Sequence, residues 1–177
     1  MTTRTARIAL GALLLGIYST LYVARRITET IREAGLLRAA VATAFSLAAL
    51  WVIVFLARNK SLRGPRTLFA TLGVALVYAV VVFPMRSPEE KLHFLEYGAV
   101  GVLALFSAPA KWSERKRFGF ATLFTLAAGW TDEGIQALLP NRYYDLRDVA
   151  FNAIAGVMAL SAFALIRWTA GAPVAGK

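Results

Sequence analysis

Cysteine is absent from the 177-residue chain, and charged residues make up only 17% of it. The absence of thiols excludes disulfides, thiolate metal sites and a cysteine nucleophile. A soluble domain of this size would need far more polar surface than so few charges supply. With hydrophobic residues at 58%, the composition is instead typical of a protein that crosses a membrane several times.

Negative charge is scarce as well, with ten acidic residues against twenty Lys and Arg, for a net charge of +10. The basic residues stand in short clusters between apolar runs, for example in residues 58–66 and 111–117. Such clusters are typical of loops beside membrane headgroups. No nucleic-acid-binding motif accompanies the charge, so we expect no nucleic-acid partner.

Long apolar runs organise the whole chain and predict about six membrane helices. The segment 25–38 instead alternates charged and apolar residues, which favours a helix lying in the membrane interface. The expected fold is an all-α transmembrane bundle that forms a single domain over residues 1–177. The six expected spans are residues 8–24, 36–57, 67–83, 92–108, 118–139 and 149–168.

Six spans would place both termini on one side of the membrane. That side carries twelve Lys and Arg residues and the other side carries eight. The positive-inside rule therefore predicts cytoplasmic termini. The turn near residue 140 and the start of the fourth span would then face outward.

Seven of the ten acidic residues of the chain gather at one surface of this outward side, in residues 89–96 and 132–148. Ionisable groups beside lipid-length apolar sequence are costly, and they usually face a protein interior or a water-filled cavity. We therefore expect a polar pocket where the fourth, fifth and sixth spans end. The seven residues are Glu89, Glu90, Glu96, Asp132, Glu133, Asp145 and Asp148.

His93 is the only histidine, and its helical spacing places it on one face with Glu90, Glu96 and Tyr97. It could make a structural hydrogen bond, act as a general acid or base, or bind a divalent metal. Glu133 is the other candidate base. A carboxylate-rich metal site would favour Mg, Mn, Ca or Zn. Its candidate ligands are His93, Glu96, Asp132 and Asp148.

The fifth span ends in Asp132, Glu133 and Gln136. Acidic residues oppose the negative dipole at a helix C-terminus, so they require a partner. Arg142, just beyond the Pro140 turn, is the nearest candidate for a bidentate ion pair.

The sixth span begins with Asp145 and Asp148, which are favourable at a helix N-terminus without any function. Asn152 lies one turn further in, and we expect it to hydrogen-bond to a neighbouring helix. Small residues in both the fourth and sixth spans predict close helix packing. They are Gly98, Gly101 and Ala104 in one, and Ala153, Gly156 and Ala159 in the other.

Five motifs follow one another in residues 90–156: EKLHFLEYG, GWTDEGIQ, PNR, DLRD and NAIAG. In this order they resemble the VanZ-like family of bacterial membrane proteins, over residues 89–157. The first three spans carry no diagnostic residue. The resemblance implies a small polytopic protein of the inner membrane. It also implies that the signature polar residues are His93, Glu96, Tyr97, Asp132, Glu133, Gln136, Arg142, Asp145, Asp148 and Asn152.

The founding member of that family is associated with reduced susceptibility to the glycopeptide antibiotic teicoplanin. This association does not identify a chemical reaction. We therefore expect a pocket that binds an amphiphilic envelope ligand, such as a lipid-linked glycan intermediate, a lipid headgroup or a lipoglycopeptide. Two alternatives stay open. One is a membrane-embedded, metal-assisted hydrolase or transferase with His93 or Glu133 as its base. The other is a small-solute or proton-coupled transporter.

Overall fold

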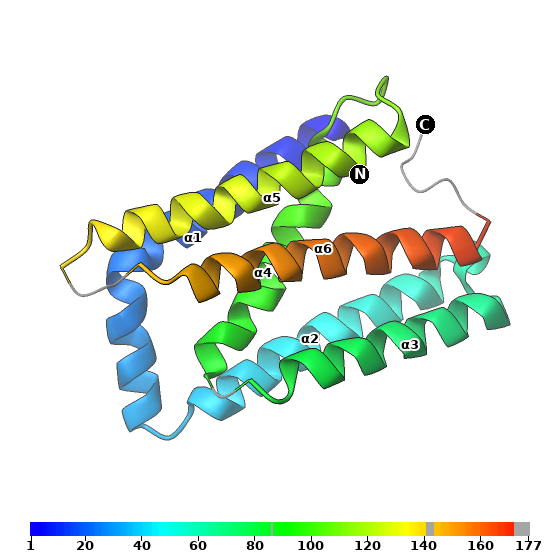
Figure 1. The fold of residues 1–177 in the computed structure, drawn as a ribbon. Coiled ribbons are helices and arrows are strands. Elements are labelled where there is room, and N and C mark those ends of the chain that lie inside the picture. The colour runs from blue at the N-terminus through cyan, green and yellow to red at the C-terminus, as the bar shows by residue number, and fades with distance from the viewer. Residues whose placement is uncertain (86, 141–143, 172–177) are drawn as a thin grey trace.

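The structure of the chain, a computed structural model, describes residues 1–85, 87–140 and 144–171, without the side chains of Arg25 and Glu89. These residues form six α-helices and one short 3-10 helix (Figure 1). In chain order the elements are α1 (Thr3–Glu33), α2 (Leu37–Arg58), η1 (Lys60–Leu62), α3 (Pro65–Val82), α4 (Pro88–Ser107), α5 (Glu114–Ala137) and α6 (Leu146–Thr169).

Four of the described helices are long and apolar enough to cross a membrane: Thr3–Ala24 within α1, together with α2, α3 and α6. The expected all-helical bundle of membrane type is therefore confirmed, whereas the count of about six spans is not. The other two long helices, α4 and α5, carry five of the seven acidic residues of the expected pocket, while Asp145 and Asp148 lie at the start of α6. These charged residues interrupt the apolar stretches of α4 and α5, which are not among the four.

Helix boundaries follow from local chemistry. Pro65 and Pro88 occupy the first positions of α3 and α4, where a missing backbone N–H costs nothing. The side chains of Ser113 and Asp145 accept hydrogen bonds from the first turns of α5 and α6. Gly35 turns the chain between α1 and α2 with a φ of 71°, a backbone conformation that suits glycine.

Helix α4 occupies the centre of the bundle, where it packs against α1, α2, α5 and α6. Figure 1 shows it crossing obliquely, while α2, α3, α5 and α6 run along the length of the bundle. The core includes Phe94, Tyr97 and Val100, which are at most 2% exposed. The last turns of α1, up to Glu33, run across the end of the bundle where α5 ends (Figure 1). These turns belong to the segment for which the sequence predicts an interfacial helix, which stays a prediction.

Small residues allow α4, α5 and α6 to approach closely, as the sequence predicts. A Cβ atom on Gly98 would lie 3.3 Å from the Cβ of Ala159, and one on Gly101 would lie 3.3 Å from the carbonyl oxygen of Gly156. A Cβ atom on Gly156 would lie only 2.5 Å from Cγ2 of Thr125 in α5. The three helices therefore cross at a point with almost no spare space.

Two arginines bind the C-terminal end of α4. Arg7 in α1 donates from Nε to the carbonyl oxygen of Ser107 (3.0 Å), and Arg117 in α5 donates from Nη2 to that of Leu105 (3.3 Å). These carbonyls have no partner within their own helix, and the positive charges complement the negative end of the helix dipole. Arg117 is 4% exposed, so this contact fixes the end of α4 inside the protein.

Candidate functional site

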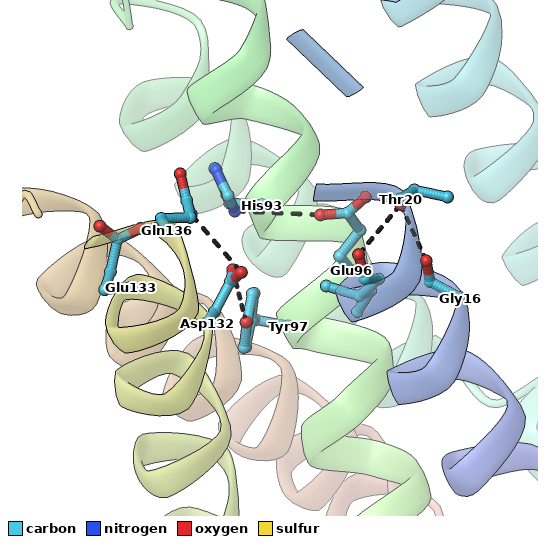
Figure 2. A network of polar contacts seen from close by, with 9 residues as sticks. Gly16, Thr20, His93, Glu96, Tyr97, Asp132, Glu133 and Gln136 are labelled. Atoms are coloured by element: carbon cyan, nitrogen blue, oxygen red, sulfur yellow. Dashed lines mark hydrogen bonds and ion pairs between the residues drawn. The ribbon is translucent and has the colours of Figure 1, made fainter. Parts of the chain in front are cut away.

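The ends of α4, α5 and α6 meet at one end of the bundle and bring together a set of polar side chains, here called the polar cluster. Figure 2 shows its residues converging from α4 and α5. Two of its carboxylates, Asp132 and Glu133, are fully buried, as is Tyr97. The cluster consists of His93, Glu96, Tyr97, Asp132, Glu133 and Gln136.

Asp132 receives hydrogen bonds from two different helices. The hydroxyl of Tyr97 donates to Oδ2 over 2.8 Å, and Nε2 of Gln136 lies 3.4 Å from Oδ1. Hydrogen bonds to an ionised carboxylate are stronger than those between neutral groups. The tyrosine therefore offsets part of the cost of burying Asp132.

Glu133 is held by donors on both of its oxygens. Gln136 donates from Nε2 to Oε1 (2.8 Å), and the backbone N–H of Asp145 donates to Oε2 (3.1 Å). The second bond ties the end of α5 to the start of α6. The ion-pair partner expected from the sequence, Arg142, lies outside the described residues. The donors to these two acidic residues include a phenol, an amide and a backbone N–H.

His93 lies closer to the surface, with 19% of its side chain exposed. Its Nδ1 atom is 3.9 Å from Oε2 of Glu96, which is too long for a hydrogen bond. Nδ1 is buried and has no hydrogen-bond partner within the described part of the chain. Electrostatic interactions also link His93 to Glu133 and Asp148. The histidine thus lies near several carboxylates, and Nδ1 makes no hydrogen bond to a described one.

The four metal-ligand candidates do not converge. Among the described residues, no three His, Asp or Glu side chains lie close enough together to hold a metal ion. Glu133, a candidate base, has both oxygens engaged by hydrogen bonds. In His93, the other candidate base, Nδ1 has no hydrogen-bond partner among the described residues. A catalytic role for either residue stays a prediction.

The three site candidates at the start of α6 take different positions. Asp145 caps the helix, since its Oδ1 accepts a hydrogen bond from the backbone N–H of Arg147 (2.8 Å). Asp148 is half-buried in the first turn. Asn152 is fully buried against Gly129 of α5, but neither atom of its amide has a hydrogen-bond partner among the described residues. The expected hydrogen bond across to a neighbouring helix is therefore not made there.

Two features of the site have no signal in the sequence. The hydroxyl of Tyr18 in α1 donates to the carbonyl oxygen of Ala128 in α5 (2.9 Å), although α1 carries no recognisable motif. In addition, a groove of about 640 Å³ lies between the end of α3 and the starts of α4 and α6. Glu90 and Arg147 lie at this groove with their side chains 3.9 Å apart. Such a groove depends on how three helices pack, which no local motif specifies.

No protein-family model, no curated protein and no solved structure matches the chain. The VanZ-like resemblance therefore depends on the five motifs. The fold and the site define a class only in coarse terms: an all-α protein with several helices of membrane-spanning length and a buried acidic cluster at one end of its bundle.

Proposed function

We propose that the chain is a VanZ-like multi-pass protein of the bacterial inner membrane, and that its polar cluster binds the polar part of an amphiphilic envelope ligand. A lipid-linked glycan intermediate, a phospholipid and a lipoglycopeptide all combine an apolar anchor with a polar head. The VanZ-like assignment is supported by the ordered motifs of residues 89–157. Helices α4, α5 and α6, which carry most of these motifs, pack against one another.

The complete burial of Asp132 and Glu133 is the observation that carries the proposal. Burying an ionised group costs several kcal/mol unless it is well paired, and apolar side chains at these positions would avoid that cost. Acidic residues within membrane helices are rare and mark functional sites by default. The hydrogen bonds from Tyr97, Gln136 and Asp145 hold both carboxylates in fixed positions, as a binding site requires.

His93 favours a binding site over a purely structural cluster. A scaffold would be expected to satisfy its buried polar atoms, yet Nδ1 of this residue has no hydrogen-bond partner among the described residues. The side chain is also partly exposed. A ligand hydroxyl, ammonium or phosphate at the edge of the cluster would complete its hydrogen bonding.

The membrane arrangement that accompanies this function has six spans and cytoplasmic termini. Helices α4 and α5 would cross the bilayer alongside the four more apolar helices, with their carboxylates covered by packing against α1 and α6. This is how membrane proteins accommodate ionisable residues. The excess of Lys and Arg on the side of the termini supports the orientation, which places the polar cluster at the outer face.

Binding of two amphiphilic probes to purified protein tests the proposal. The probes are teicoplanin, which is a lipoglycopeptide, and a polyprenyl-linked disaccharide. We expect at least one of them to bind, and we expect His93→Ala and Asp132→Asn each to weaken that binding about tenfold. For His93, tenfold corresponds to the loss of one hydrogen bond to a charged group. Asp132 is fully buried, so its substitution acts by disturbing the hydrogen bonds that position the polar cluster.

Glu33→Gln is the matched control, because Glu33 is an exposed carboxylate at the end of α1. It should bind the probes like the parent chain. Each variant is first checked for expression and for a single peak in gel filtration. Unchanged binding by folded His93→Ala and Asp132→Asn would contradict the polar cluster as the binding site.

A further inference from the structure

The groove between α3, α4 and α6 has an apolar wall and a charged mouth. Its lining includes Val81 from α3, Phe94 from α4, and Phe151 and Ile154 from α6. Arg147 lies at the same groove, seven residues before Ile154. At 1.5 Å per residue, the apolar wall extends roughly 10 Å along α6 below this arginine. A groove of this shape suits part of a hydrocarbon chain.

Among the described residues that line the groove, the charged ones are Glu90 and Arg147, which lie in the first turns of α4 and α6. Nη2 of Arg147 lies 3.9 Å from Oε1 of Glu90, and their side chains are 71% and 23% exposed respectively. The guanidinium also lies over the ring of Phe151, 5.9 Å from its centre. At 3.9 Å the pair is held by charge attraction rather than by a close hydrogen bond. Both groups can therefore turn towards a ligand.

Opposite charges side by side select among lipid headgroups. Arginine binds phosphate well because its planar fork of N–H groups matches the phosphate oxygens. A carboxylate beside it suits a group that carries positive charge and N–H donors. A headgroup with a phosphate and a primary ammonium matches both, whereas a headgroup whose only charge is its phosphate offers Glu90 no group of opposite charge.

The geometry points to a lateral phospholipid site in this groove, occupied by phosphatidylethanolamine. The phosphate of the lipid binds Arg147, its ammonium group binds Glu90, and one acyl chain lies along the apolar wall. This inference extends the proposed function, on which it depends for the membrane setting of α3, α4 and α6. A bilayer lipid bound in the groove, beside the polar cluster, is then a constant partner of the protein.

Native mass spectrometry of the purified full chain, titrated with phosphatidylethanolamine or phosphatidylglycerol, tests the inference. The parent chain should retain phosphatidylethanolamine about tenfold more strongly. Arg147→Gln should lower the binding of both lipids. Glu90→Gln should abolish the preference, because it removes the partner of the ammonium group. Equal binding of both lipids by the parent chain, or an unchanged preference in Glu90→Gln, would overturn the inference.

A second variant separates the groove from the two charges. Ile154 is 44% exposed, so Ile154→Trp can fill the groove without disturbing the core, and it should reduce retention of phosphatidylethanolamine while leaving both charges in place. Arg115→Gln, an exposed arginine in the first turn of α5, is the control and should change nothing. Retention of the lipid by Ile154→Trp at the parent level would show that it binds elsewhere.

The lipid site and the polar cluster can fail independently. His93→Ala should weaken the binding of the amphiphilic probes and leave phosphatidylethanolamine bound in the groove. If the parent chain binds the amphiphilic probes but shows no preference for phosphatidylethanolamine, only the groove is refuted as a lipid site. If the lipid preference is present but folded His93→Ala binds the probes like the parent chain, only the polar cluster is refuted as their binding site.

Discussion

Tyr97 in α4 donates a hydrogen bond of 2.8 Å to Asp132 in α5, across 35 residues of sequence. Both side chains are fully buried, so this contact joins two helices through a carboxylate that water cannot reach. It also fixes which face of α5 points into the bundle. The polar cluster is organised around this pair, and the first prediction concerns it.

Tyr97→Phe should destabilise the protein, because it leaves a buried carboxylate without one of its donors. A change of this kind costs about 1–3 kcal/mol. The thermal midpoint of unfolding in detergent measures the effect. Tyr22→Phe removes a hydroxyl from a side chain that is 53% exposed, and its midpoint should match that of the parent chain. Equal midpoints for the two variants would contradict the buried bond.

Gly156→Ala should separate α5 from α6, since its Cβ would come within 2.5 Å of Cγ2 of Thr125. Overpacking of this kind costs about 1–3 kcal/mol. Gly119→Ala is the matched control in α5, because a Cβ there meets nothing within 4 Å. It should be neutral or slightly stabilising, as is usual for alanine in place of a helical glycine. Thermal unfolding in detergent measures both.

The same crossing allows a rescue. Thr125→Ser removes Cγ2 and keeps the hydroxyl that donates to the carbonyl oxygen of Ala121. Combined with Gly156→Ala, it should recover part of the lost stability. A double variant no more stable than Gly156→Ala would show that the clash is not with Thr125.

Arg117→Gln should loosen the end of α4, because it removes a buried positive group from the helix C-terminus. The expected cost is about 1–2 kcal/mol. Arg117→Lys should rescue it poorly, since an ammonium group does not reproduce the fork of N–H donors. Hydrogen exchange of the last turn of α4 measures the change. The comparison variant is Arg115→Gln, whose exposed side chain lies two residues away; exchange that rises equally in both would contradict the capping role.

Asn152→Leu should leave the thermal midpoint unchanged or raise it. The amide of Asn152 is buried and lacks a hydrogen-bond partner among the described residues, and an apolar group of similar shape avoids that penalty. Thermal unfolding in detergent checks the expectation. A loss of more than about 1 kcal/mol would mean that the amide makes a hydrogen bond in the folded protein.

The helices could be predicted from the sequence because each apolar run is bounded by proline, glycine or charge. The expected start of the second span at residue 36 and its end at residue 57 each differ by one residue from those of α2 (Leu37–Arg58). Other boundaries differ more: α4 and α5 each begin four residues before the expected starts at residues 92 and 118. Helix α1 continues without a break from the apolar run into the segment expected as a separate interfacial helix, and it ends at Glu33. Charged residues at helical spacing support a helix as well as apolar ones do, so hydropathy alone misplaces these ends.

The polar cluster could be predicted only as a set of residues. Alternating spans imply that the start of α4 and the end of α5 lie together, which placed His93 near Asp132. The particular partners could not be predicted, because they depend on the rotation of each helix about its axis. For this reason the bond from Asp145 to Glu133, and the lack of a described partner for Asn152, were not foreseen.

Access to position 93 from outside the cell tests the central claim most directly. The chain has no cysteine, so His93→Cys introduces a single thiol at the edge of the polar cluster, where the histidine is partly exposed. We predict that a membrane-impermeant methanethiosulfonate reagent will label this thiol in intact spheroplasts. Labelling only in inverted membrane vesicles, or only after denaturation, would contradict a polar cluster that opens to the outer face of the membrane.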